Sequence, residues 1–269
     1  MKALRDACRR SSHRLEWWAI RFVSLFARYP VSIAYPFLGE KIRFEVRNSL
    51  EYTKILSSDG EKRSLDFLAG SLGSGDVFFD LGAGKGLYAA SLGKKIRGLK
   101  IFAFEPNPAE RGRLEAHLAV NGVLGATVVE WAVSDSEEDR ELDLFFDDVS
   151  AGAFRPHGYE NRRYDRQARV LSRSLDSALR RGLLPVPDAM KIDIEGAEVL
   201  CLRGSAALFD GVFGKRPRTV CLELHYRTLS AYGASPADVL SFFAEKGYRI
   251  ADDYPRGTEW QYIFVDAKT

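Results

Sequence analysis

Two short segments in the second half of the chain place charged side chains at alternate positions. Lys191, Asp193 and Glu195 are separated by single apolar residues, so in a strand all three would project from one face. Glu223 and His225 are also two residues apart, at the end of the next expected strand. The carboxyl ends of parallel strands border the ligand crevice of an open sheet. We therefore expect these groups to converge at one crevice.

A histidine and several carboxylates in one crevice are typical of a site that removes a proton. We expect His225 to be the general base, because its unperturbed pKa is ~6.5. Asp193 or Glu195 is the alternative base, or the group that orients the histidine, and Glu223 belongs to the same expected catalytic set. Two other interpretations stay open. One is a structural cluster of salt bridges, and the other is a site for Mg²⁺, which suits oxygen-rich ligands. We favour no metal.

A glycine-rich turn follows an apolar strand at residues 77–86, which read VFFDLGAGKG. Glycines permit positive φ and close approach of a ligand, and the following helix start presents free N–H groups. The spacing differs from the dinucleotide pattern G-x-G-x-x-G, and Asp80 before the first glycine would repel a pyrophosphate. An acid there suits the ammonium and sulfonium of S-adenosylmethionine. The loop therefore favours a methyltransferase over a nicotinamide dehydrogenase.

The next expected strand also ends in an acid. Glu105 lies within the segment FEPNP and can accept both ribose hydroxyls of an adenosine. Ala132, at the end of the third strand, is expected to supply a backbone contact beside the adenine. The complete set of expected cofactor contacts is Asp80, Gly82, Ala83, Gly84, Lys85, Gly86, Glu105, Pro106, Asn107, Ala132 and Asp193.

Strands alternate with helical patterns of 10 to 15 residues, which predicts an α/β, doubly wound and mostly parallel sheet. Expected strands cover 77–81, 100–104, 126–133, 190–194, 219–224, 248–251 and 261–265, and expected helices cover 87–96, 108–120, 197–209 and 236–246. Composition agrees with a globular protein: 46% of residues are hydrophobic and 28% are charged. This excludes a disordered chain, collagen and a disulfide scaffold.

The net charge of +2 disfavours nucleic acid as a partner. Three cysteines without C-x-x-C spacing indicate reduced thiols in a cytoplasmic protein.

Residues 1–56 are expected to form an N-terminal extension, followed by a cofactor-binding domain over residues 57–269. Apolar residues at helical spacing within 15–25 predict an amphipathic helix, and alternation over 31–46 predicts two strands joined by a turn. The helix is expected to pack on the domain or on a second copy of the chain, which leaves a homo-oligomer open. Peripheral membrane contact through Trp17 and Trp18 is the alternative, since the stretch is too short and too charged to span a membrane.

A segment at about residues 140–187 interrupts the alternation of strands and helices and is rich in arginine. We expect it to form one wall of the acceptor pocket, with Arg162, Arg163 and Arg166 contacting the acceptor. Guanidinium groups pair well with phosphate, sulfate or carboxylate, so an anionic acceptor is expected. A solvated charged loop is the competing interpretation.

Three motifs together resemble the FkbM-type methyltransferases. That family carries a D-x-G-A-x-x-G loop, an F-E-P-N-P strand end and a K-x-D-x-E-G-x-E segment, matched here at 80–86, 104–108 and 191–198. The resemblance implies a class I, Rossmann-like fold whose last strand is antiparallel, with S-adenosylmethionine as cofactor and S-adenosylhomocysteine as product. One departure is that Gly84 and Lys85 stand where the family commonly has asparagine and an apolar residue. Lys85 could face the methionine carboxylate instead.

The resemblance also implies an activity. It favours O-methylation of a hydroxyl on a sugar, glycolipid or natural product, so the acceptor is expected to be a small molecule, a glycan or a peptide. N-methylation of peptide amide side chains is the alternative. A non-catalytic, methyltransferase-like binding protein is the further alternative, although the intact cofactor loop argues against it.

Overall fold

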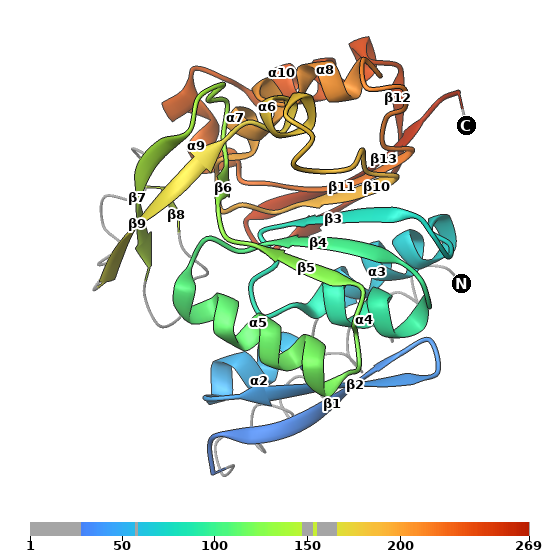
Figure 1. The fold of residues 1–269 in the computed structure, drawn as a ribbon, viewed down its shortest axis with the longest axis vertical. Coiled ribbons are helices and arrows are strands. Elements are labelled where there is room, and N and C mark those ends of the chain that lie inside the picture. The colour runs from blue at the N-terminus through green and yellow to red at the C-terminus, as the bar shows by residue number, and fades with distance from the viewer. Residues whose placement is uncertain (1–27, 57–58, 147–152, 155–165, 269) are drawn as a thin grey trace, which may run out of the picture. The chain divides into compact units, whose positions relative to one another are not determined.

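A computed structural model describes residues 28–56, 59–146, 153–154 and 166–268 (Figure 1). The chain divides into two compact units, Met1–Arg63 and Ser64–Thr269, and the division falls inside α3 (Asp59–Ser71). The expected boundary between residues 56 and 57 stays a prediction. The expected amphipathic helix lies outside the described residues. None of the helices described here is both long and apolar enough to cross a membrane.

The first unit contains the expected hairpin. Strands β1 (Val31–Phe37) and β2 (Glu40–Val46) pair antiparallel, with Val31 opposite Val46. Every second residue is buried in each strand, which is the period of two that the sequence shows. Gly39, with φ 87°, supplies the left-handed conformation of the turn. Helix α2 (Ser49–Leu56) follows.

The second unit is built on a seven-stranded sheet in the order β12-β13-β11-β10-β3-β4-β5 (Figure 1). Strand β13 is antiparallel to both of its neighbours, and the other pairings are parallel. The expected doubly wound sheet with an antiparallel last strand is therefore confirmed. Its strands are β3 (Val77–Leu81), β4 (Lys100–Phe104), β5 (Ala126–Val129), β10 (Ala189–Ile192), β11 (Thr219–Leu224), β12 (Tyr248–Arg256) and β13 (Glu259–Asp266).

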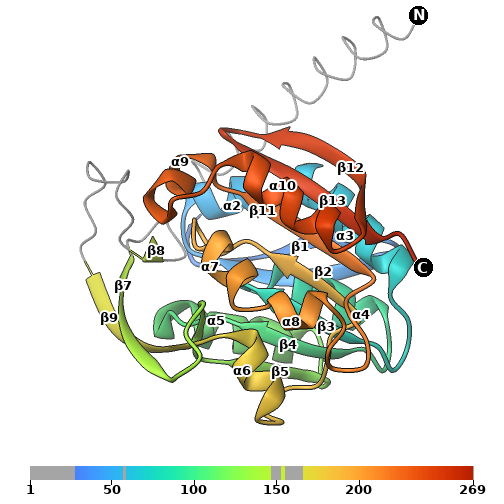
Figure 2. The same ribbon diagram turned by 90° about the horizontal axis from the view of Figure 1, so that it is seen from above.

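Helices cover both faces of this sheet (Figure 1). One face carries α4 (Leu87–Lys95) and α5 (Pro108–Val120). The other carries α6 (Leu175–Arg180), α7 (Glu198–Arg203), α8 (Ala206–Phe209) and α10 (Pro236–Glu245), and Figure 2 looks onto these helices from above. Helix α9 (Tyr226–Leu229) and a 3₁₀ turn (Ser230–Tyr232) follow β11.

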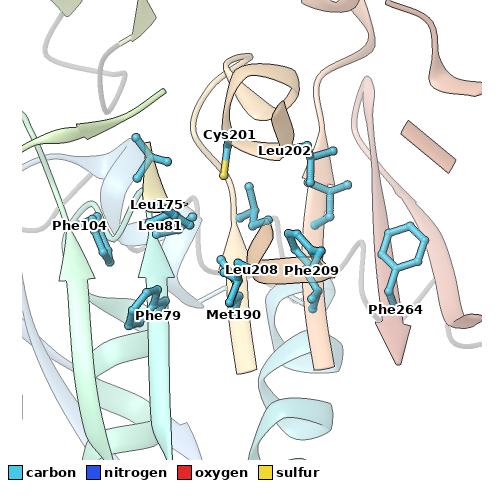
Figure 3. Close-up of a cluster of buried hydrophobic side chains, with 14 of the residues drawn as sticks. Phe79, Leu81, Phe104, Leu175, Met190, Cys201, Leu202, Leu208, Phe209 and Phe264 are labelled. Carbon is cyan, nitrogen blue, oxygen red and sulfur yellow. The ribbon is translucent and has the colours of Figure 1, made fainter. Parts of the chain in front are cut away.

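The core between the sheet and the second helical layer is apolar and densely packed (Figure 3). Phe243 of α10 stacks on Phe264 of β13 with ring centroids 3.8 Å apart, and Phe209 of α8 meets Phe243 edge-on. Cys201 and Cys221 are both buried, and the reduced state expected for the cysteines stays a prediction. This packing holds the strand ends, from which the site is built, in a rigid frame.

Three expected element boundaries were wrong. The strand expected over 126–133 ends at Val129, and β6 (Ala132–Val133) belongs to a second sheet of order β6-β9-β7-β8. The chain changes sheets around Trp131, whose ring turns inward and meets Phe104 edge-on at 5.0 Å. The remaining strands of this sheet are β7 (Arg140–Phe146), β8 (Ala153–Phe154) and β9 (Arg166–Arg173).

The helix expected over 197–209 is two short helices, α7 and α8, which are separated at Gly204. A β-carbon at Gly204 would lie 2.1 Å from the carbonyl oxygen of Ser134. The backbone of Ser134 therefore packs closely against Gly204, where a side chain would not fit. The strand expected over 190–194 ends at Ile192, because the chain enters a turn at Asp193.

Candidate active site

The glycine loop at the end of β3 is held by backbone contacts. The amides of Gly82 and Ala83 both donate to the carbonyl oxygen of Phe104 on β4, at 3.1 and 2.9 Å. Gly82 has φ 75°, and a β-carbon there would lie 1.8 Å from the carbonyl oxygen of Asp193. The loop therefore packs directly against the turn after β10, and only glycine fits at this position.

Gly84 has different surroundings in the same loop. It has φ 53°, and no heavy atom beyond Gly84 and its two chain neighbours lies within 4 Å of the position that a β-carbon would take. Its amide donates to Glu105 Oε2 at 2.8 Å. Space above the loop, with a carboxylate beneath it, fits a ligand that carries hydroxyl and ammonium groups. These residues therefore suit S-adenosylmethionine.

Glu105 is 1% exposed at the end of β4. Its other oxygen, Oε1, accepts from the amide of Asn107 at 2.8 Å, and the Asn107 side chain caps α5 by accepting from Ala109. Burial raises the pKa of Glu105 to about 8, although the two backbone hydrogen bonds oppose this shift. The carboxyl group thus gains a proton near neutral pH in the protein without its ligand.

Lys191 of β10 links the glycine loop to the acidic residues. Its ammonium group donates to the carbonyl oxygen of Gly82 at 2.8 Å and lies 3.3 Å from Asp193 Oδ2 and 3.7 Å from Asp80 Oδ1. Asp80 is fully buried and accepts from the amide of Ala89, which ties it to α4. A single lysine thus joins the ends of β3 and β10.

The structure brings the four expected catalytic residues together. Ligating atoms of Asp193, Glu223 and His225 lie within 4.8 Å of one another. His225 Nε2 lies 3.9 Å from Glu195 Oε2. The expected reason was wrong, however, because Glu195 is not on a strand: it has φ 53° in the turn after β10. The turn, rather than the alternation of a strand, directs Glu195 toward the histidine.

Charges shift the protonation of this cluster. Burial by itself would lower the pKa of His225, but its hydrogen bond to Glu198 and the charges of Glu198, Asp193 and Glu195 raise it to about 10. Burial would raise the pKa of Asp193, but the positive charges of Lys191, His225 and Arg256 hold it below its usual value. In the protein without ligands, His225 is therefore an imidazolium beside the carboxylate of Asp193.

Asp193, Glu223 and His225 have the residue types and spacing of a metal-binding group. Two of these residues already have cationic partners: Lys191 beside Asp193, and Arg256, which forms a close ion pair with Glu223. A divalent ion would have to compete with both side chains. A metal site therefore stays the less favoured interpretation.

Other expected contacts have different neighbours or lie outside the described residues. The Lys85 ammonium is 3.3 Å from Glu110 Oε2, and its carbonyl oxygen contacts His117 Nδ1 at 2.8 Å, so its side chain is directed to α5. Ala132 pairs with Ser172 in the second sheet. Cofactor contacts from Lys85, Ala132, Pro106 and the rest of the set stay predictions.

The arginines of the 140–187 segment divide into two groups. Arg162 and Arg163 lie outside the described residues, and Arg166 begins β9, with only its backbone described. Four arginines of the segment pair with acids: Arg169 with Glu141 and Asp143, Arg173 and Arg181 with Asp139, and Arg180 with Glu137. Arg173 is buried, and the other three lie at the surface.

Sequence reasoning assigned no role to Glu198 or Arg256. Glu198 is the last residue of the K-x-D-x-E-G-x-E segment, so the motif pointed to this position. Its contact with His225, however, could not be predicted from the spacing of residues along the chain. Arg256 is 33 residues from Glu223 along the chain, and only the pairing of β12, β13 and β11 brings the two together.

The sheet order, the glycine loop and the acid at the end of the second strand define the fold of class I S-adenosylmethionine-dependent methyltransferases. Residues 80–250 match the family described as "Methyltransferase FkbM domain", and the chain belongs to this family. The resemblance drawn from three short motifs is thereby confirmed.

Known proteins with related sequences and structures are also methyltransferases. The chain is 25% identical over 207 residues to the hexuronic acid methyltransferase AglP of Haloferax volcanii. These 207 residues are 77% of this chain and 77% of AglP. Its fold is similar to the precorrin-6y C5,15-methyltransferase of Geobacter metallireducens (16% identity, TM-score 0.43, 77% of this chain and 89% of that one). A further similar structure is TYW2 of M. jannaschii in complex with AdoMet (15% identity, TM-score 0.43, 89% and 87% covered).

Proposed function

We propose that this chain transfers a methyl group from S-adenosylmethionine to a hydroxyl of a sugar, glycolipid or natural product. One observation carries the proposal. The cluster of Asp193 and His225 lies directly against the glycine loop, because Gly82 packs on the backbone of Asp193. In addition, the Lys191 ammonium contacts both the Gly82 carbonyl oxygen and the Asp193 carboxylate. A proton-accepting group and a methyl donor bound at the loop would therefore be neighbours.

The cofactor residues of the proposal are those of the glycine loop and Glu105. Glu105 would accept hydrogen bonds from the ribose, and the open position above Gly84 would take the amino-acid part of the ligand. Bound S-adenosylmethionine would supply an electrophilic methyl group whose C–S bond breaks as the acceptor oxygen attacks. The carboxylates of Asp80 and Asp193 suit the positive charge of such a ligand.

In the proposal, His225 Nε2 accepts the hydroxyl proton as the new O–C bond forms. Only a neutral imidazole can do this, and without ligands the pKa of His225 is about 10. A positive charge beside the ring, such as a sulfonium, favours the neutral form and lowers that pKa. Asp193 is the alternative proton acceptor. Glu195 and Glu223 complete the cluster that orients the histidine and the acceptor.

The acceptor class rests on the hexuronic acid methyltransferase relative and on arginine content. A hexuronic acid carries hydroxyls together with a carboxylate. Arg162, Arg163 and Arg166 would pair with such an anion, whereas Arg169 and Arg173 already have acidic partners. We therefore favour an anionic sugar over a neutral one.

The test is methyl transfer to a panel of acceptors. Purified protein is incubated with S-adenosylmethionine and a uronic acid glycoside, a neutral hexoside or an asparagine-containing peptide. S-adenosylhomocysteine and the mass of the product are then measured. We expect methylation of the uronic acid glycoside on a hydroxyl oxygen.

Other results would replace the proposal. Methylation of the peptide alone would favour N-methylation. Binding of S-adenosylmethionine without turnover on any acceptor class would favour a binding protein, and activity lost on chelation and restored by Mg²⁺ would favour the metal interpretation.

A further inference from the structure

Glu198 is a fully buried carboxylate at the start of α7, and one of its oxygens touches two separate segments. Oε1 accepts from the amides of Ile194 and Gly196, at 3.3 and 3.0 Å. The same oxygen lies 2.9 Å from Nδ1 of His225. Glu198 therefore joins the turn after β10 to the residue that follows β11.

The turn and the His225 segment also pack tightly against each other. Gly196 has φ 103°, and a β-carbon there would lie 2.5 Å from Thr228 Cγ2. The Thr228 hydroxyl donates to the carbonyl oxygen of His225 at 2.8 Å. These contacts leave little room for the turn to move away from the histidine. The position of Glu195 relative to His225 is thus set by packing as well as by Glu198.

The contact between Glu198 and His225 also determines which ring nitrogen carries a hydrogen. A carboxylate can only accept a hydrogen bond, so Nδ1 must be protonated when it pairs with Glu198. In the neutral ring, Nε2 then has no hydrogen and can accept one. Nε2 is the nitrogen that lies toward Glu195, on the side of the acidic cluster.

We infer that Glu198 is the positioning residue of the active site, which holds His225 in the tautomer whose Nε2 accepts the acceptor's proton. This inference rests on the proposed function. The charged groups that face His225 are Glu198 of α7, Asp193 and Glu195 of the turn, and Glu223 of β11. Lys191 and Arg256 pair with Asp193 and Glu223, and Tyr232 lies near Glu198.

The test is Glu198→Gln, which keeps the size of the side chain. An amide oxygen at the place of Oε1 can still accept from Ile194, Gly196 and Nδ1, but the negative charge beside the ring is lost. We expect kcat to fall by at least about tenfold, because a neutral amide stabilises the imidazolium that forms during proton transfer less than a carboxylate does. Affinity for S-adenosylmethionine should change less than about twofold, because Glu198 is outside the glycine loop.

A readout independent of turnover follows the histidine itself. The chain has four histidines, so NMR can resolve the His225 ring, with its signal assigned by its loss in His225→Ala. In the wild type the neutral ring should carry hydrogen on Nδ1, and in Glu198→Gln the His225 titration should move to lower pH by one unit or more, because the charge beside Nδ1 is lost. Asp176→Asn is the matched control. Asp176 is also a buried carboxylate, but it accepts from Ala207 and Leu208, so this variant should keep the wild-type titration and pH–rate profile.

The outcomes separate this inference from the proposed function. Wild-type kcat and an unshifted His225 titration in Glu198→Gln would overturn it. If no acceptor is methylated by the wild type, the proposed function fails, while the NMR shift still decides whether Glu198 holds His225. Should Glu198→Gln not fold, the wild-type ring decides: neutral His225 with hydrogen on Nε2 would overturn the inference.

Discussion

The two halves of the site, the glycine loop at 80–86 and the turn at 193–198, are held in place in different ways. The loop is fixed mainly by its own backbone, because the amides of Gly82 and Ala83 donate hydrogen bonds to the carbonyl oxygen of Phe104. It also packs closely against Asp193, which requires that residue 82 has no β-carbon. The turn is fixed by a side chain, because the Glu198 carboxylate accepts hydrogen bonds from two amides of the turn and also contacts the His225 ring. The first half therefore depends on glycine, and the second depends on charge.

This difference predicts which substitutions impair binding and which impair chemistry. Changes in the loop should weaken the cofactor complex or the fold itself. Changes around the turn should reduce turnover while the cofactor still binds.

The largest effect is expected at His225. His225→Ala removes the proposed proton acceptor, so kcat should fall by roughly 10²–10⁴-fold while the Kd for S-adenosylmethionine changes less than about twofold. Initial rates with saturating cofactor and calorimetric binding measure the two quantities. Equal loss of both would mean that the histidine supports cofactor binding. Full activity would mean that proximity alone carries the reaction.

The next effect tests the glycine loop. Gly82→Ala adds a β-carbon at 1.8 Å from a backbone oxygen of Asp193, so the loop must shift as well as adopt a strained φ. We expect the free energy of unfolding to fall by more than about 2 kcal/mol, of which left-handed strain explains about 1–2. Chemical denaturation measures this change.

Two other glycines separate strain from contact. Gly122 has φ 69° with no other atom near an added β-carbon, so Gly122→Ala should show strain alone. Gly84→Ala should lose as little stability as Gly122→Ala but should bind S-adenosylmethionine less tightly, because its methyl group enters the space above the loop. Equal stability of the Gly82 and Gly122 variants would show that the glycine loop can move away from Asp193 at little cost in free energy, which would contradict this prediction.

The same contrast explains what could be predicted from the sequence. The mostly parallel sheet and the glycine loop follow from local patterns of glycine, apolar residues and acids, while the antiparallel last strand was implied by the resemblance to the FkbM family. The convergence of Asp193, Glu195, Glu223 and His225 was also expected, but for the wrong local reason, since Glu195 lies in a turn. The contact of Glu198 was not predicted, because its partner His225 lies 27 residues away along the chain.

Charge counts along the chain misled in a similar way. Between residues 154 and 181 the sequence holds eight arginines and three acids, which indicates a strong positive charge. The acids that pair with Arg169, Arg173, Arg180 and Arg181 lie earlier, at residues 137–143. Antiparallel pairing of β7 with β9 brings Glu141 and Asp143 to Arg169, and a linear count does not include that pairing.

A smaller effect concerns pH and Glu105. In the free protein the pKa of Glu105 is about 8, so below pH 8 a bound proton must leave before the carboxylate can accept from both ribose hydroxyls. Affinity for S-adenosylmethionine should therefore rise by up to tenfold per pH unit between pH 6.5 and 8 and then level off. Calorimetry across this range measures the slope, and proton release to the buffer should accompany binding at pH 7.

Glu105→Gln is the matched control, because its amide oxygen accepts hydrogen bonds but does not titrate. The α-amino group of the cofactor ionises in the same range, so the informative quantity is the difference in slope between the two proteins. A slope unchanged by the substitution would assign the pH dependence to another group and would leave Glu105 without its proposed role.

The smallest effect is expected from the arginines proposed to contact the acceptor. Residues 153–173 carry six arginines against Glu160 and Asp165, but Arg169 and Arg173 pair with earlier acids. The remaining excess is on Arg155, Arg162, Arg163 and Arg166. Replacing Arg162, Arg163 and Arg166 together by glutamine should raise the KM for an anionic acceptor several-fold, and added salt should raise the wild-type KM as well. The Kd for S-adenosylmethionine should stay constant in both experiments.

Salt is informative here because it screens exposed charges far more than buried ones. Rising salt should therefore affect acceptor KM while the His225-dependent kcat stays constant, which separates the arginines from the buried cluster. Arg169→Gln is the matched control, since it removes one arginine that already has acidic partners, and it should leave acceptor KM unchanged. If the triple variant behaves like Arg169→Gln, these arginines do not contact the acceptor, and an anionic acceptor loses its support from this segment.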